Sequence, residues 1–398
     1  MGSKRSAIEA GIVEAERHHD VIASGFMHLP DGAMVVAKDF DAAQYLEGVL
    51  TMVERIQASP DQLSSLINSA RGHPSIRFNR LGLELFIACR QYASKICRLV
   101  EGEWTPLYKG HRLHPLLAVG LPVIAKFERQ VQLAAQQDHD RLHRLMDEMA
   151  KEIRERCRSE QAKVKAENFA SNSRAKLRRA LKYLVSLFKK RSRLLILRVD
   201  LYVRPGAREW GYSDEADDAF DYFADALARS QIVPDVVGWM IAREDGIERG
   251  RHYHVLVAVD GHKHQAGASL AKLIGEFWVS ECVGSSIVAS YFNCFALLKT
   301  YRHLGIGMVR CDDAEKLLGL FYAVRYLCKE SVMLIPNAGR PRNFRRGEVD
   351  GDYVRRGAPR QMEDDLRLAE SVLLRPRPRK KAAVPQERHR AFLYECPR

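Results

Sequence analysis

The sequence lacks long apolar runs, paired cysteines and an excess of acidic residues. No stretch of 18 consecutive apolar residues occurs in its 398 residues, so we expect no transmembrane helix and no membrane partner. The first residues, Met1 to Arg5, lead into charged positions instead of the apolar core of a signal peptide, which argues against secretion. The 8 cysteines form no C-x-x-C pair and fit neither a zinc knuckle nor a disulfide framework. These absences together predict a reduced, cytoplasmic protein.

Basic side chains outnumber acidic ones, with 63 Lys and Arg against 50 Asp and Glu, and the net charge is +13. Charge alone favours an anionic partner, with nucleic acid as the leading candidate and an acidic membrane surface as the second. The hydrophobic fraction of 46% is typical of a globular protein with a real core. The length suggests two or three domains.

We divide the chain into three parts from its patterns. Residues 1–190 are predicted to form a helical N-terminal region, residues 191–350 an α+β domain, and residues 351–398 a basic, proline-broken and disordered tail. In the first part, Ser59 to Gln62 has the pattern of a capping box with proline at the first helical position. It predicts a helix that continues through Leu63 and Ile67.

A basic amphipathic helix is predicted near the end of the first part. Its apolar side chains are spaced 4, 3 and 4 residues apart, at Leu177, Leu181, Leu184 and Phe188. The other faces carry Arg174, Arg178, Arg179, Lys182, Lys189 and Lys190. Two interpretations remain open, a solvated helix face and a face that follows the phosphates of a nucleic acid.

From Leu194 onward, strand and helix patterns alternate. Strands are predicted at 194–203, 236–244 and 251–259, with a helix capped by Ser213 between the first two. A helix at 267–281, a less regular region at 284–310 and a last helix that begins near 312–315 follow. This order is that of a ferredoxin-like split βαβ unit, an α+β fold with an antiparallel sheet and helices on one face.

The strand at 251–259 carries two histidines, His252 and His254, on either side of Tyr253. Side chains alternate faces along a strand, so both imidazoles point the same way and can form half of a metal site. A hairpin turn near Asp245 would bring Glu244 beside them as a third ligand. The pattern also arises by chance: a second copy, His262 and His264, lies in a polar segment and is expected to form a solvated turn. A solvent-exposed carboxylate remains the alternative for Glu244.

The last predicted helix carries Tyr322 and Tyr326, four residues apart and therefore on one face. Arg325 and Lys329 lie close to them in the sequence. Such tyrosines often only pack. Attack of a tyrosine on a phosphodiester, however, requires nearby cations to neutralise the phosphate, and a metal ion would polarise it. Two tyrosines would allow two successive transesterifications.

The motif His252-Tyr253-His254, followed by Tyr322, Tyr326, Leu327, Cys328 and Lys329, resembles the HUH endonuclease superfamily of rolling-circle replication initiators. The segment Arg198-Val199-Asp200, the hairpin from Glu244 to His254 and the run Arg325 to Lys329 look more narrowly like inovirus-type gene II replication proteins, including prophage-borne proteins of the YagK/YfjJ type. The likeness covers residues of about 190–350.

The resemblance implies an HUH endonuclease domain that nicks one DNA strand at the origin of a phage or prophage. His252, His254 and Glu244 would hold Mg2+ or Mn2+. Tyr326 would attack the phosphate and form a 5′-phosphotyrosine link, Tyr322 would be the second nucleophile, and Lys329 would assist at the phosphate. Origin or single-stranded DNA, a host helicase and a polymerase would be the partners.

Other functions and contacts remain open at the level of sequence. A two-tyrosine transposase would share these residues, and a non-catalytic origin-binding or regulatory protein would share the basic charge. Relaxases place the tyrosine before the histidines, which argues against one. Arg345 and Arg346, together with Arg325, are predicted to contact the DNA backbone, with a solvated loop as the alternative for the first two.

Overall fold

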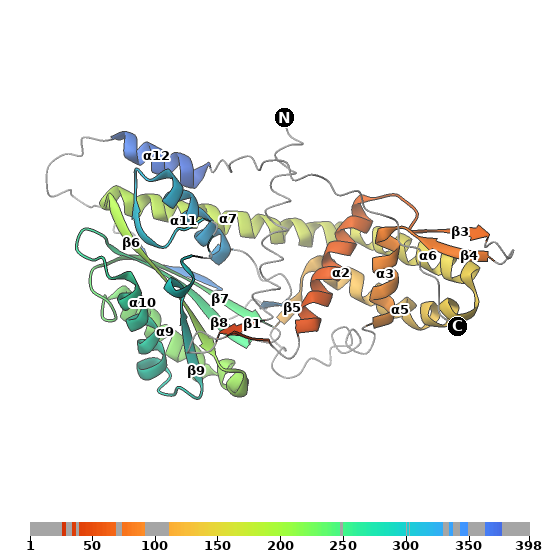
Figure 1. Cartoon of the computed structure of the whole chain (residues 1–398), viewed down its shortest axis with the longest axis horizontal. Helices are drawn as coiled ribbons and strands as arrows, with labels where there is room; N and C mark the ends of the chain where they lie inside the picture. The colour runs from red at the N-terminus through yellow and green to blue at the C-terminus, as the bar shows by residue number, and fades with distance from the viewer. Residues whose placement is uncertain are drawn as a thin grey trace. The chain divides into compact units, whose positions relative to one another are not determined.

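The computed structural model describes residues 26–28, 34–36, 40–68, 74–91, 111–246, 250–299, 301, 303–328, 334–336, 343–348 and 363–375 (Figure 1). Contacts within the chain divide it into two compact units. An α+β unit consists of Met1–Glu47, Trp104–Pro115 and Lys165–Pro376, and a mainly helical unit consists of Gly48–Glu103, Leu116–Val164 and Arg377–Arg398. The proposed boundaries at residues 190 and 350 remain predictions.

The helical unit contains four helices and one hairpin among its described residues. The helices are α2 (Phe40–Ala58), α3 (Arg80–Gln91), α5 (Pro115–Gln137) and α6 (His139–Arg158), of which α2 and α5 begin in the other unit. Asp138 begins α6 because its side chain accepts a hydrogen bond of 2.8 Å from the backbone N–H of Arg141. The buried face of α6 includes Leu142, Met146, Met149 and Ile153.

The helix predicted after Ser59 is wrong, because the chain forms a strand there. The backbone N–H of Asp61 donates to the Ser59 hydroxyl at 3.2 Å, and that hydroxyl donates to the Asp61 carboxylate at 2.8 Å. This local turn leads into β3 (Ser64–Asn68), which pairs antiparallel with β4 (Pro74–Phe78). Residues that cap helices also favour turns, and here the pairing of β3 with β4 favoured the turn and strand over the helix.

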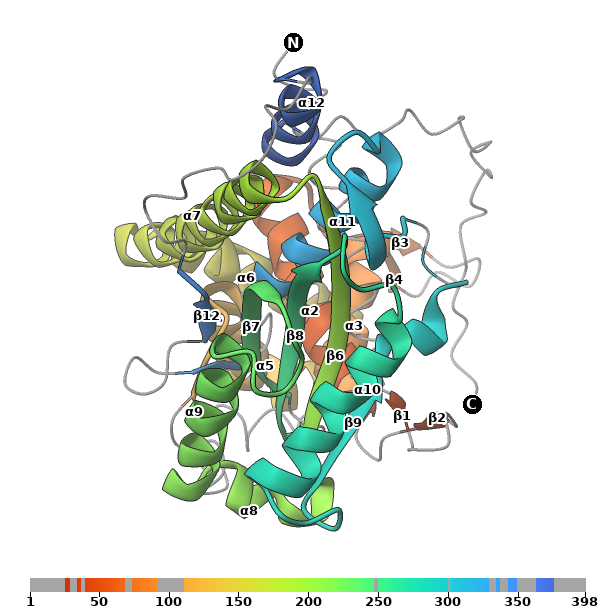
Figure 2. The same cartoon turned by 90° about the vertical axis from the view of Figure 1, so that its left-hand side faces the viewer.

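The sheet of the α+β unit is antiparallel, and the predicted α+β class is confirmed. Its strands are β6 (Arg193–Val203), β7 (Val236–Gly246), β8 (Gly250–Asp260), β9 (Ala289–Asn293), β10 (Gly307–Arg310) and β12 (Phe344–Arg346). The order is β10-β6-β8-β7-β12, and β9 pairs with the second half of β6, on the edge that β10 shares (Figure 2). β9 and β10 lie in the region 284–310 that the sequence pattern left irregular.

Helices cover both faces of this sheet, so the predicted one-sided arrangement is wrong. α9 (Asp214–Ala228) and α10 (Gly267–Phe277) pack on one face. α7 (Glu160–Lys190), α11 (Ala314–Cys328) and α12 (Glu363–Leu374) pack on the other (Figure 1). The reason is visible in the central strand β8, whose residues are all buried and therefore need a cover on both sides.

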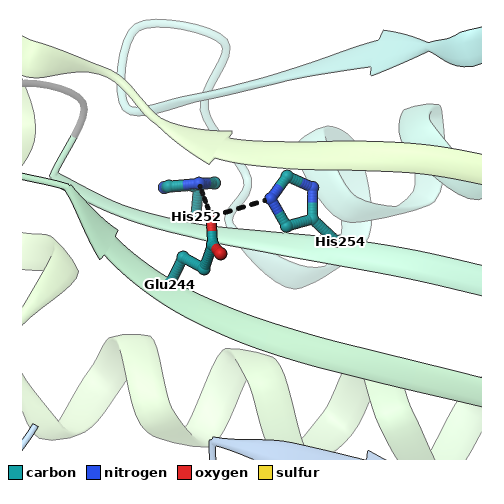
Figure 3. A group of neighbouring side chains, drawn as sticks. All are labelled: Glu244, His252 and His254. Atoms are coloured by element: carbon teal, nitrogen blue, oxygen red, sulfur yellow. Dashed lines mark hydrogen bonds and ion pairs between the residues drawn. The ribbon is translucent and has the colours of Figure 1, made fainter. Parts of the chain in front are cut away.

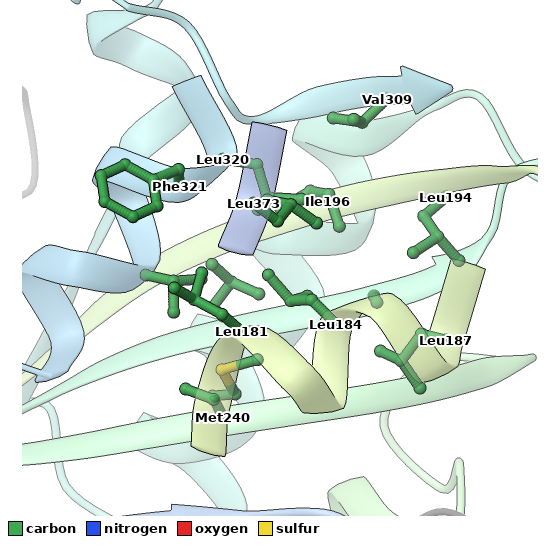
Figure 4. Packing of buried hydrophobic residues seen from close by; sticks show 14 of the residues in the cluster. Leu181, Leu184, Leu187, Leu194, Ile196, Met240, Val309, Leu320, Phe321 and Leu373 are labelled. Atoms are coloured by element: carbon green, nitrogen blue, oxygen red, sulfur yellow. The ribbon is translucent and has the colours of Figure 1, made fainter. Parts of the chain in front are cut away.

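Most of the apolar stripe predicted on α7 is buried in the core between the sheet and the helices α7, α11 and α12. Leu181, Leu184 and Phe188 are at most 5% exposed and belong to one core cluster. Figure 4 shows Leu181 and Leu184 with Ile196 of β6 and Leu320 of α11 from the same cluster. Burying an aliphatic or aromatic side chain of this kind contributes about 1.5–3 kcal/mol. This core therefore fixes α11 over the sheet.

The prediction of a disordered tail over residues 351–398 fails for residues 363–374, which form α12. The helix packs on the core through the fully buried side chains of Ala369 and Leu373, with Leu366 partly buried beside them. Their spacing of three and four residues makes one apolar face, which was overlooked beside the basic residues that follow. The basic segment 376–381 lies outside the described residues.

The shorter elements complete the description. Two small antiparallel pairs join β1 (Phe26–His28) to β2 (Met34–Val36) and β5 (His111–Leu113) to β11 (Leu334–Pro336). Helical turns lie at η2 (Pro205–Ala207), α8 (Arg208–Gly211), η3 (Trp278–Cys282) and η4 (Cys294–Leu297). Among the described residues, no helix has the length and apolar character needed to cross a bilayer.

Candidate metal centre

Three side chains that the sequence predicts as metal ligands meet on one face of the sheet. Glu244 on β7 pairs directly with His252 on β8, and His254 follows two residues later on the same face. The Nε2 atoms of His252 and His254 each lie 3.1 Å from Oε2 of Glu244 (Figure 3). The three ligand atoms lie within 4.8 Å of one another, and no second group of this kind occurs in the described part of the chain.

The second nitrogen of each imidazole is held by an oxygen that can only accept. Nδ1 of His252 donates to the backbone carbonyl of Gly250 at 3.2 Å, and Nδ1 of His254 donates to Oδ1 of Asp200 at 2.6 Å. In the neutral imidazoles both protons are therefore on Nδ1, and both Nε2 atoms carry lone pairs. Fixing a histidine through its outer nitrogen in this way is characteristic of metal sites.

These residues fit a divalent cation. Two Nε2 lone pairs and a carboxylate oxygen converge at 3.1 Å, an arrangement of three acceptors that is repulsive unless a cation or a proton lies between them. Two histidines and one carboxylate are a ligand set that leaves coordination positions open. The donor set does not select one metal.

Burial and charge act in opposite directions on the buried pair of His254 and Asp200. Burial lowers the pKa of His254, but the carboxylates of Asp200 and Glu244 outweigh it and raise the pKa above its usual value. Burial likewise raises the pKa of Asp200, and His254 together with Arg198 holds it well below its usual range. Asp200 is therefore ionised at neutral pH and able to accept a hydrogen bond from Nδ1 of His254.

Gly250 sets the entry into the histidine strand. Its φ of +65° lies in the left-handed region, and a Cβ at this position would lie 3.3 Å from Cγ of Arg208. The same residue supplies the carbonyl that orients His252. Tyr253 points into the opposite layer, as predicted, where its ring stacks on Phe220 at 4.4 Å between centroids.

Tyr326 is the tyrosine that α11 places against the metal ligands. Its ring lies edge-on to the ring of His254 with 4.9 Å between centroids. The guanidinium carbon of Arg198 lies 4.7 Å from the centroid of the same ring, and Nε of Arg198 lies 3.7 Å from Oδ1 of Asp200. Arg198 thus links the tyrosine to the carboxylate behind His254, and a cation at this distance over an aromatic ring is attractive.

Tyr322 lies one helical turn before Tyr326, and its ring stacks on His303 at 4.8 Å between centroids. Close backbone approach fixes this part of α11, since a Cβ on Gly305 would lie 2.1 Å from the carbonyl carbon of Gly319. Asp313 caps the helix, since its carboxylate accepts from the backbone N–H of Lys316 at 3.0 Å. The neighbouring Asp312 pairs with Arg310.

The described part of the chain places three of the four other predicted site residues. Arg325 is half-buried on α11 beside Tyr326, and Lys329 lies outside the described residues. Arg345 forms an ion pair with Asp221 of α9, while Arg346 lies over the ring of Tyr183 of α7 at 4.9 Å. These two arginines sit on the edge strand β12, and their contact with DNA remains a prediction.

Asp200 and Arg198 were not recognised from their chemistry in the sequence. Asp200 faces His254 in the β6–β8 register, although 54 residues separate them. A usable signal was present, because a basic and an acidic side chain two residues apart interrupt one face of an apolar strand. By contrast, His262 and His264 form the predicted solvated turn, where they contact Ser192 and Asp235.

Comparison with known sequences gives one family likeness. No curated protein and no solved structure matched the chain. The segment that carries the sheet, the three ligands and both tyrosines, residues 154–346, matches the family described as YagK/YfjJ C-terminal domain.

Proposed function

We propose that this protein is a metal-dependent single-strand DNA endonuclease that uses Tyr326 as its nucleophile and initiates rolling-circle replication of a phage or prophage. The observation that carries the proposal is the contact between the Tyr326 ring and His254, at 4.9 Å between centroids. It brings a tyrosine to a three-ligand group from 72 residues further along the chain. A tyrosine that serves only to pack in the core does not have to lie against three candidate metal ligands.

The strand order supports an HUH-type core. Counting β6, β7, β8 and β9 as strands one to four, the sheet order β9-β6-β8-β7 is 4-1-3-2 with every pair antiparallel. With α9 and α10 as the two crossovers, this order is the one expected of a ferredoxin-like split βαβ unit and supports that part of the proposal. The histidines lie on its third strand, next to the first, and the likeness to the YagK/YfjJ family favours a prophage setting.

Each residue then has a defined task in the transesterification. Oη of Tyr326 gives up its proton and attacks the scissile phosphorus, the new Oη–P bond replaces the P–O3′ bond, and the 3′ oxygen takes up a proton and leaves as a free 3′-OH. Glu244, His252 and His254 would hold Mg2+ or Mn2+, which would polarise the phosphate as a Lewis acid. Asp200 orients His254, and Arg198 holds the ring of Tyr326 against it.

Tyr322 is the second nucleophile in this proposal. Residues four apart on a helix lie about 6 Å from each other, close enough for a second attack once the strand shifts. Tyr326 is assigned the first attack because its ring contacts a metal ligand, whereas Tyr322 stacks on His303. In the sequence Arg325 precedes Tyr326 and Lys329 follows it by three residues, and both would neutralise phosphate charge.

A covalent adduct tests the proposal. Full-length protein is incubated with labelled single-stranded DNA that carries candidate origins and with Mn2+, and the products are separated on a denaturing gel. We expect a labelled protein band that disappears with EDTA and in Tyr326→Phe but persists in Tyr322→Phe, which is the matched control. The absence of an adduct with every candidate origin would contradict the nuclease and favour a non-catalytic DNA-binding protein. Adducts formed only on the ends of a mobile element would favour a transposase.

A further inference from the structure

The second half of α7 exposes a continuous row of cations with no acidic residue between them. Five exposed basic side chains define what we call the α7 stripe: Arg174, Arg178, Arg179, Lys182 and Lys189. From residue 174 to residue 193 the sequence contains no Asp or Glu. Arg174, Arg178 and Lys182 are spaced four apart, so they lie in line over about 12 Å of helix.

The α7 stripe is weakly neutralised within the described part of the chain. No ion pair with Arg174, Arg178, Arg179 or Lys182 is found there. Lys189 approaches Glu370 of α12 at 3.7 Å, but both side chains are exposed, at 57% and 42%, so water screens the pair. The field of this row therefore remains available to an anionic partner.

The position of the α7 stripe connects it to the tyrosines. The hydroxyl of Ser173 donates to the backbone carbonyl of Cys328 at 3.4 Å, which places the start of the row beside the end of α11 that carries Tyr326. Toward the other end, the exposed Arg346 of β12 lies over the ring of Tyr183 of α7. The stripe thus begins beside the end of α11, and Arg346 adds a further exposed cation against the same helix.

We propose that the α7 stripe binds the phosphate backbone of the single DNA strand that Tyr326 attacks. The inference rests on the proposed function for the identity of the strand. A membrane surface is disfavoured by the packing of the same helix: membrane-bound helices insert an apolar face, and the apolar face of α7, with Leu181, Leu184 and Phe188, is already buried in the core. A nucleic-acid backbone requires only the exposed cations.

Salt dependence of binding tests the inference without any chemistry. A labelled single-stranded oligonucleotide of mixed sequence is titrated with full-length protein in EDTA over a range of salt concentrations, and anisotropy gives the affinity. For the variant Arg174→Gln, Arg178→Gln, Lys182→Gln, we expect the slope of log K against log salt to fall by about 2, since each phosphate contact contributes about 0.7. At 0.1 M salt the same loss of three contacts weakens binding roughly 100-fold.

The matched control removes the same charge from the other face of the sheet. Arg229 of α9, Lys272 of α10 and Arg310 of β10 each pair with a carboxylate, and Arg229→Gln, Lys272→Gln, Arg310→Gln should leave the slope unchanged. If the slope falls equally in both variants, or in neither, the inference is overturned. Binding to phosphatidylserine vesicles is measured in parallel, and a stripe variant that loses only vesicle binding would also overturn it. If the slope falls as expected in the stripe variant but the wild-type protein forms no covalent adduct, DNA binding by the α7 stripe is supported and the proposed nuclease activity is contradicted.

Discussion

Replacing Asp200 with asparagine should weaken metal binding although Asp200 is not a ligand. The carboxylate accepts from Nδ1 of His254 at 2.6 Å and is only 9% exposed. An asparagine of the same shape lacks the charge that raises the basicity of His254 and fixes its ring. Loss of such an outer partner typically costs 10- to 100-fold in metal affinity, or about 1.4–2.7 kcal/mol of binding free energy.

The same substitution also affects stability, and a control must separate the two effects. Asp200→Asn leaves the buried Arg198 without its carboxylate, and breaking a buried pair costs about 3–5 kcal/mol. Asp245→Asn is the matched control: Asp245 is 2% exposed and pairs with Arg251 at 3.2 Å, on the face of the hairpin opposite the histidines. It should lower stability without changing metal affinity.

Calorimetric titration with Mn2+ measures the affinity, at a temperature where circular dichroism shows that each variant is folded. The expected result is a 10- to 100-fold higher dissociation constant for Asp200→Asn and an unchanged one for Asp245→Asn. A dissociation constant for Asp200→Asn within about twofold of wild type would refute the role assigned to the Asp200–His254 hydrogen bond. Equal losses in both variants would assign the effect to general destabilisation.

Three further predictions concern the metal, acid stability and the histidine strand. Mn2+ at 100 times its dissociation constant should stabilise the protein by about 2.7 kcal/mol and raise the Tm by about 5–10 °C in a thermal scan, an increase absent from His254→Ala. Asp260 accepts a hydrogen bond from Arg191 at 2.7 Å. Burial raises the pKa of Asp260, but the hydrogen bonds from His262 and Arg191 outweigh burial and lower this pKa. The ionised Asp260 therefore stabilises the fold fully above a pH of about 4, and this stabilisation is lost as the pH falls further. The difference in unfolding free energy between wild type and Asp260→Asn, about 1.5–3 kcal/mol at pH 6, should therefore shrink in urea titrations below pH 4, and a difference that grows in acid would contradict this. Tyr253→Phe should be neutral or stabilising by up to about 1 kcal/mol in urea titrations, because the buried Tyr253 hydroxyl finds no hydrogen-bond partner among the described residues; a clear loss would show that it has one.

Much of the α+β unit is encoded locally and was predicted from the sequence. The apolar runs of β6 and β8, the cap at Ser213 and the apolar stripe of α7 each depend on residues within a few positions of one another. Local patterns failed where pairing partners decide. The capping residues after Ser59 became a turn before β3, and β9 and β10 exist only because β6 offers them a free edge.

The candidate site shows the same division. The order of residues along the strand determined that His252 and His254 share a face, and the hairpin determined that Glu244 lies near them. Arg198 and Asp200 could not be placed from spacing, since their contacts depend on the β6–β8 register and on the position of α11. The cover on both faces of the sheet also escaped prediction, because burial of a whole strand is a property of the packed core.

By itself, the sequence determined the chemical groups of this protein: two imidazoles on one strand, two tyrosines on one helix face and a row of cations on α7. Periodicity along the chain suffices for these, because strand and helix geometry fix which neighbours share a face. Only the tertiary structure decided that Tyr326 contacts His254, that Asp200 accepts a hydrogen bond from Nδ1 of His254, and that the α7 stripe begins beside the tyrosine helix. Those contacts join residues from 54 to 155 positions apart, so they depend on strand register and core packing, which no local pattern encodes.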